Sequence, residues 1–193
     1  MNITVLGATG MAGAAIVLEA ARRGHHVTAV SRNPQDTNDP HATVARLDLT
    51  DLEAPLYPVL DNADVVVLAV RMAAGDEARV ASLTSRVLDH AALTGVRVLV
   101  VGGAALLCSP RDPGLLVLDD PAFVPTQWRE IASASLDQFT ACTEHPNQHW
   151  TYLSPSEVFE PGQGTGAYRR GGNTLLINHD GTSRITPADL GHV

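Results

Sequence analysis

The chain has 193 residues, which is enough for one domain with a buried core. Its formal net charge of −8 excludes the broad basic surface that sequence-independent binding to nucleic acid requires. Its 13 Lys and Arg residues are all Arg. The absence of Lys excludes a Walker-type phosphate lysine, a Schiff-base lysine and a Tyr-x-x-x-Lys catalytic pair.

Cysteine usage and hydropathy indicate the compartment. The two cysteines, Cys108 and Cys142, cannot form a disulfide framework. The N-terminus has no basic segment ahead of its first apolar run, so we expect no signal peptide. The longest uncharged, mostly apolar stretch, Val98 to Cys108, is too short to span a membrane. We therefore expect a cytoplasmic protein that binds neither membrane nor nucleic acid, and the sequence does not indicate its oligomeric state.

Strands and helices alternate along the chain. The run Val65 to Leu68 is apolar without alternation, which is typical of a parallel sheet covered on both faces. The β-α-β order predicts a doubly wound α/β fold with a parallel Rossmann sheet, as a single domain over residues 1–193. The expected strands are Asn2–Leu6, His26–Ser31, Ala42–Leu47, Asp64–Val70, Val96–Val101 and Trp150–Leu153; the expected helices are Met11–Arg23, a short one from Thr50 or Asp51 towards Leu60, Asp76–Leu93 and Thr126–Cys142.

The C-terminal part has a different pattern. Residues 173–178 and 182–186 flank an Asp-Gly turn signal, which predicts a small β-hairpin. Thr186, Pro187 and Asp189 then form a favourable helix start, with Thr as N-cap, Pro at the first position and an acid at the third. Only a few residues follow, so we expect this helix to be cut short by truncation of the chain.

The first strand leads into the motif Gly7-x-x-Gly10-x-x-Gly13, and an Ala-rich helix follows. Gly7 permits a tight turn, Gly10 lets the backbone approach a pyrophosphate, and Gly13 permits close packing of helix on strand. Thr9 and Met11 lie where the helix N-terminus offers free N–H groups. An ordinary glycine-rich turn is the alternative, but the position between strand and helix favours a dinucleotide site.

The end of the second strand indicates which dinucleotide binds. An NAD site carries an acid there for the ribose 2′-hydroxyl, whereas this chain has Ser31-Arg32. A guanidinium and a hydroxyl suit a 2′-phosphate, so NADP(H) is favoured over NAD(H). The alternative for Arg32 is a solvated surface residue. Asp48, beside Leu49 after the third strand, either accepts from the adenine amino group or caps the following helix.

These motifs, with the Asp64–Val70 strand, resemble the short-chain dehydrogenase/reductase superfamily. The segments Val98–Ala104 and Trp150–Pro155 look like its atypical NAD(P)H-binding branch, which contains flavin reductases, biliverdin-IXβ reductase and NmrA-like proteins. The resemblance implies that Arg71 lies near the cofactor phosphates or ribose and that Pro155 lines the nicotinamide. It further implies cofactor contacts from Leu49, Ala69, Val70, Gly102 and Gly103.

The chain departs from that family where a proton donor is expected. Leu106 stands where the branch often has Ser, and the helix Thr126–Cys142 contains neither Tyr nor Lys. We therefore assign no catalytic residue, and expect the proton to come from water. The acceptor is expected to lie beside Ala104, Cys108, Ser109 and Ser156; the eight His show no metal-ligand spacing, and we expect no metal.

The sequence thus predicts an NADPH-dependent oxidoreductase that transfers hydride to a small molecule, namely a flavin, quinone or similar flat acceptor. The missing Ser, Tyr and Lys leave open a non-enzymatic, NmrA-like regulator that senses NAD(P). A sugar-nucleotide epimerase or dehydratase is the third possibility, and it ranks last because that class relies on the Tyr–Lys pair.

Overall fold

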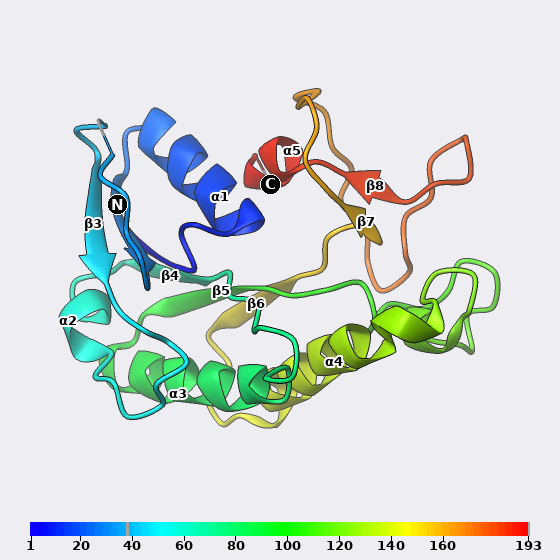
Figure 1. Ribbon diagram of the computed structural model, residues 1–193, viewed down its shortest axis with the longest axis horizontal. Coiled ribbons are helices and arrows are strands. Elements are labelled where there is room, and N and C mark those ends of the chain that lie inside the picture. The colour runs from blue at the N-terminus through cyan, green and yellow to red at the C-terminus, as the bar shows by residue number, and fades with distance from the viewer. Residues whose placement is uncertain (38, 193) are drawn as a thin grey trace.

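Within the residues that this computed structural model describes, 1–37 and 39–192, six parallel strands form a central sheet in the order β3-β2-β1-β4-β5-β6 (Figure 1). The order reverses between β1 and β4, which is the switch point of a doubly wound sheet. The strands are β1 (Asn2–Leu6), β2 (His26–Ser31), β3 (Ala42–Arg46), β4 (Val65–Leu68), β5 (Arg97–Val101) and β6 (Trp150–Leu153). The predicted fold class and strand order along the chain are confirmed.

Helices cover both faces of this sheet. Helix α1 (Met11–Arg22) and the short C-terminal α5 (Pro187–Gly191) lie on one face, and α3 (Arg79–Thr94) and α4 (Arg129–Glu144) pack side by side on the other (Figure 1). A single turn of helix, α2 (Tyr57–Leu60), precedes β4. It is shorter than the sequence predicts, because the segment that starts at Thr50 forms turns before it. No helix among the described residues has the length and apolar character needed to cross a membrane.

Each face of the sheet has its own apolar core. On the α3–α4 side, Leu6, Val30, Leu68 and Val100 pack against helix residues such as Leu83. The other side is made of smaller residues, because α1 is Ala-rich and lies close to the sheet. Leu190 of α5 belongs to this second core, and a Cβ at Gly191 would lie 2.9 Å from the Ala15 carbonyl oxygen. The last helix therefore rests directly on the backbone of the first.

The predicted C-terminal hairpin is not formed, and this is a correction. The Asp-Gly turn is present, since the Asn178 N–H donates to the Thr182 carbonyl at 2.7 Å. The two arms, however, pair with other parts of the chain. Strand β8 (Arg184–Ile185) pairs in parallel with β7 (Val158–Phe159), and Thr174 forms a bridge to Cys108. Burial of Leu175, 2% exposed, among loop residues outweighs the local tendency to form a hairpin.

Candidate cofactor-binding site

The β1–α1 turn is shaped by two glycines that contact backbone. Gly7 has φ +88°, and both Gly7 and Ala8 donate their N–H to the Val30 carbonyl at 3.0 Å. A Cβ at Gly7 would lie 2.4 Å from the Ala69 carbonyl oxygen, and one at Gly13 would lie 2.2 Å from the Gly7 carbonyl oxygen. Side chains are therefore excluded at both positions by the fold itself.

Gly10 is glycine for a different reason. It is exposed, its φ is −76°, and apart from its chain neighbours the nearest atom to a Cβ there would be the Gly7 carbonyl oxygen, at 3.3 Å. Gly10 is also the N-cap of α1, and it provides no side-chain cap. The first turn contains no acid, so the N–H groups and the positive end of the helix dipole face outward beside exposed Thr9 and Met11. This arrangement suits an anion such as a pyrophosphate.

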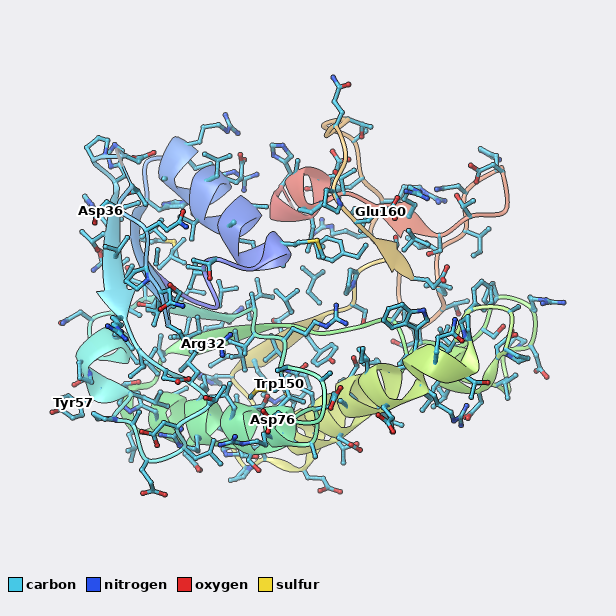
Figure 2. The ribbon with its side chains drawn as sticks, in the orientation of Figure 1. Arg32, Asp36, Tyr57, Asp76, Trp150 and Glu160 are labelled. Carbon is cyan, nitrogen blue, oxygen red and sulfur yellow. The ribbon has the colours of Figure 1, made fainter. Side chains whose placement is uncertain are left out.

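At the end of β2, Arg32 is exposed at the edge of the sheet (Figure 2). Ser31 is 6% exposed, and its hydroxyl has no hydrogen-bond partner among the described residues. The Ser31 hydroxyl is covered in this structure, so Arg32 is the group that meets an incoming anion first. The sequence reasoning treated the two residues alike.

Asp48 does not cap a helix, because α2 begins only at Tyr57 and has Leu56 as its N-cap. Its Oδ1 accepts from the Thr50 hydroxyl at 2.7 Å and from the Thr50 N–H at 2.9 Å, which closes a turn. These bonds hold the pKa of Asp48 below its usual value, with smaller contributions from the charges of Arg32 and Arg79. The neighbouring Leu49 is buried in the core, so a cofactor contact from it would involve its backbone.

The predicted contacts after β4 lie beside the glycine turn. The Ala69 N–H donates to the Leu6 carbonyl at 2.9 Å, and the Ala69 carbonyl faces Gly7. Ala69 and Val70 are half-buried and Arg71 is exposed. The structure thus brings these three residues to the same edge of the sheet as the α1 N-terminus.

Beyond β5 and β6 lie the residues expected near the nicotinamide. Gly102 and Gly103 are half-buried, and the Gly102 N–H donates to the Leu153 carbonyl at 3.0 Å. Pro155 is buried and Ser156 half-buried just after β6. All four follow the carboxyl ends of the adjacent parallel strands β5 and β6.

A small lobe, formed by residues 104–124 and 173–177, extends from the end of β5. Its own apolar core contains Leu107, Val117 and Leu175, with Ala104 and Leu106 packed against it. Half-buried Cys108 joins the two parts, because its N–H donates to the Asn173 carbonyl at 2.7 Å and its carbonyl accepts from the Leu175 N–H at 3.1 Å.

Ser109, predicted beside the acceptor, is instead used inside the lobe. It is 0% exposed, and its hydroxyl donates to Oδ2 of buried Asp120 at 2.7 Å while accepting from the Arg111 N–H. Asp120 also accepts from the Ala122 N–H at 2.9 Å, and these bonds lower the pKa of its carboxyl. The sequence reasoning missed Asp120; an Asp between the apolar run 115–118 and Pro121 was the available signal.

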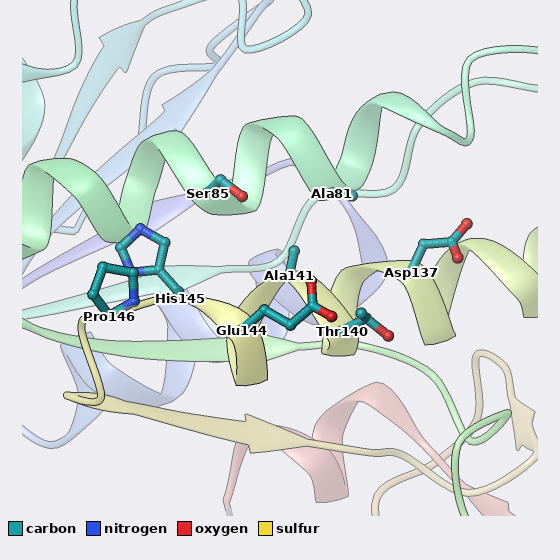
Figure 3. A pocket seen from close by; sticks show the side chains of 8 residues that line it. All are labelled: Ala81, Ser85, Asp137, Thr140, Ala141, Glu144, His145 and Pro146. Carbon is teal, nitrogen blue, oxygen red and sulfur yellow. The ribbon is translucent and has the colours of Figure 1, made fainter.

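A groove of about 400 Å³ between α3 and α4 lies elsewhere in the molecule, lined by side chains that include Ser85, Asp137 and Glu144 (Figure 3). None of the predicted cofactor or acceptor residues lines it. In the part of the chain that the structure describes, no three His, Cys, Asp or Glu side chains come together as metal ligands.

Comparison with known proteins agrees with this geometry. Residues 7–193 match a family model described as NAD(P)H-binding. The protein YwnB of Bacillus subtilis, which is uncharacterized, is 33% identical over 98% of this chain and 88% of its own length.

Two solved structures resemble the whole chain. One is a Streptococcus pneumoniae protein whose proposed activity is NADH-flavin reductase (TM-score 0.88, 30% identity, 99% of this chain and 89% of that one). The other, from Bacteroides thetaiotaomicron, has a proposed epimerase activity (TM-score 0.86, 29% identity, 99% and 87%). The chain therefore belongs to the NAD(P)H-binding family, within the atypical branch of the short-chain dehydrogenase/reductase superfamily.

Proposed function

We propose that the protein is an NADPH-dependent reductase that transfers hydride to a flavin, quinone or similar flat acceptor. The observation that carries the proposal is the uncapped N-terminus of α1, which is open at Gly10 and has exposed Arg32 at the same edge of the sheet. These residues fit a phosphorylated dinucleotide: Gly10 and Met11 would hold the pyrophosphate, and Arg32 would pair with a 2′-phosphate. The bound cofactor would supply the hydride.

The nicotinamide half would extend along the carboxyl edge towards β5 and β6. Ligands of such sheets lie outside the carboxyl ends of the strands near the switch point. That path leads past Arg71 to Gly102, Gly103 and Pro155. The protein's contribution would be to hold the nicotinamide and the acceptor face to face and to keep water from between them.

The described side chains near this path favour hydride transfer without an essential proton donor. The Ser109 hydroxyl is bonded to Asp120 inside the lobe. The Tyr152 hydroxyl donates to the Ser135 carbonyl at 3.0 Å, and burial raises the pKa of Tyr152. Leu106 and the absence of Lys remove the usual Ser and Tyr–Lys groups. Reduction of a flavin or quinone needs no such donor because water can supply the proton.

The lack of the usual Ser and of the Tyr–Lys pair weighs against an epimerase, even though a similar structure has that proposed activity. This lack also favours a second candidate, a regulator in which bound NAD(P) controls association with another protein. The reductase would oxidise NADPH catalytically in the presence of an acceptor, whereas the regulator would bind NADPH without turnover.

The test is steady-state NADPH oxidation with FMN, FAD and a short quinone offered in turn. Turnover with at least one acceptor is expected for the parent protein. We expect Ser156→Ala to lower kcat by less than about tenfold, since a lost general acid typically costs about 10²–10⁴-fold. NADPH binding without turnover on any acceptor would favour the regulator, and a hundredfold loss in Ser156→Ala would identify a proton donor.

A further inference from the structure

Tyr152 of β6 fills the space that a side chain at Gly102 would need. A Cβ at Gly102 would lie 1.8 Å from the Tyr152 hydroxyl oxygen and 2.0 Å from its Cζ. The Phe139 ring packs against the same phenol in a T-shaped pair, with ring centroids 5.1 Å apart. Gly102 does not have a positive φ, so the phenol and not a special turn conformation requires glycine there.

Gly103 is held in a similar way from α4. A Cβ at Gly103 would lie 2.5 Å from the Ser135 hydroxyl oxygen. The carbonyl of Ser135 accepts the Tyr152 hydroxyl hydrogen bond at 3.0 Å. The Tyr152 hydroxyl therefore connects β6 with α4. Gly102 lies against Tyr152, and Gly103 lies against Ser135.

The hydroxyl is one end of a buried polar chain. The Gln138 Oε1 lies 3.3 Å from it as a second acceptor, and the Gln138 Nε2 donates to the Thr84 hydroxyl at 3.2 Å. Thr84 in turn donates to the Val80 carbonyl at 2.8 Å. Gln138 and Thr84 are 3% and 0% exposed, inside an otherwise apolar layer.

Hydrogen bonds in such a chain restrict the relative orientation of the elements they join, whereas apolar residues only fill the space between them. Burying polar groups costs free energy unless they are bonded, and a fully bonded network specifies one arrangement of the elements it joins. Here it joins α3, α4 and β6 at the point where the Gly102–Gly103 turn begins.

We infer that Tyr152 is a positioning residue for the nicotinamide half of the cofactor, acting through the Gly102–Gly103 turn that its hydroxyl fixes. The inference rests on the proposed cofactor position. Tyr152 keeps its proton in this role, because that proton is donated to Ser135. In the proposed position, the pyrophosphate and adenosine parts of the cofactor would lie at β1 and β2, so their binding should not depend on Tyr152.

The test compares NADPH with 2′-phospho-ADP-ribose, which lacks the nicotinamide, by calorimetry. In Gly102→Ala, the new methyl overlaps the phenol, so the Kd of NADPH should rise about tenfold, or about 1.4 kcal/mol, and that of the fragment less than about twofold. Adding Tyr152→Val to Gly102→Ala makes room for the methyl and should return the NADPH Kd to within about threefold of the parent.

Tyr152→Phe keeps the ring and removes only the hydroxyl, so it should fold. It should raise the NADPH Kd by about threefold, shift the fluorescence of bound NADPH, and leave fragment binding unchanged. Tyr57→Phe on exposed α2 is the matched control and should change none of these.

Equal weakening of both ligands in Gly102→Ala would show a general structural effect and overturn the inference. The inference would also be overturned if the double variant did not recover its affinity for NADPH. An unchanged fluorescence of bound NADPH in Tyr152→Phe would overturn it as well. If the parent protein bound the fragment but not NADPH, the inference would fail while the phosphate site stood. If it bound neither, the proposed function would fail first.

Discussion

At the scale of single residues, the three motif glycines should respond differently to substitution. Gly7 and Gly13 lie against backbone atoms, whereas Gly10 faces outward. We expect Gly10→Val to abolish NADPH binding while the melting temperature stays within a few degrees of the parent. Gly13→Val is the matched control, and it should unfold the protein, because its Cβ would lie 2.2 Å from the Gly7 carbonyl oxygen. Unchanged NADPH affinity in folded Gly10→Val, measured by calorimetry, would refute the site.

Arg32 is the residue on which cofactor choice should depend. A charge-assisted contact to the 2′-phosphate is worth roughly 1.5–3 kcal/mol, or about 10- to 100-fold in affinity. Arg32→Ala should therefore bring NADPH affinity close to that of NADH and leave NADH nearly unchanged. Arg46→Ala, at the end of neighbouring β3, is the control. Equal binding of the two cofactors by the parent protein would contradict the preference.

At the scale of elements, the five-residue helix α5 depends on Asp189. This carboxylate is 4% exposed, accepts from the Thr165 and Gly166 N–H groups at 2.8 Å, and accepts from the Thr186 hydroxyl at 3.0 Å. These bonds lower its pKa despite burial. Asp189→Asn should lower the free energy of unfolding by roughly 1.5–3 kcal/mol in urea titrations. Exposed Asp36→Asn should leave it unchanged; a similar loss in both variants would refute the role of Asp189.

The elements also show where sequence reasoning succeeds and where it fails. The strands with continuous apolar runs, such as Val65–Leu68, and the glycine turn were predictable because their signals are local. The hairpin was predicted wrongly, because its two arms pair with Val158–Phe159 and with Cys108. These partners lie far away in the sequence, and no local pattern indicates such pairing. The lobe after β5 was missed for the same reason: its core joins residues that lie far apart in the chain.

The candidate site likewise has a part that a local motif predicts and a part that depends on tertiary packing. The motif indicated the α1 N-terminus, whereas the covered Ser31 hydroxyl and the Ser109–Asp120 bond depend on three-dimensional packing. The contact of Tyr152 with Gly102 has no sequence signature, because an aromatic residue on a short strand is typical of core packing.

At the scale of the whole molecule, acid should weaken the fold through Glu19. Arg22, and then Arg23 and His192, hold the pKa of this carboxylate at about 2, against an ordinary value of 4.5. Its stabilising contribution is complete above pH 4.5 and is lost as the pH falls towards 2, because the unfolded chain binds the proton first. Glu19→Gln should therefore lose less stability than the parent between pH 5 and about 2.5, measured by thermal melting. Exposed Glu53→Gln should follow the parent curve; a Glu19→Gln curve parallel to the parent's would contradict this assignment.

The packing of α5 on α1 has a consequence for synthesis. Ribosomes release the chain from its N-terminus, so the β1–α1 turn emerges early and its covering helix emerges late. Until α5 arrives, the face of α1 around Ala15 and the apolar residues that Leu190 covers stay open to water or to a chaperone. A nascent chain can therefore form its β1–α1 glycine turn before the second core is closed, and cofactor bound at the proposed site would favour the conformation that α5 later covers.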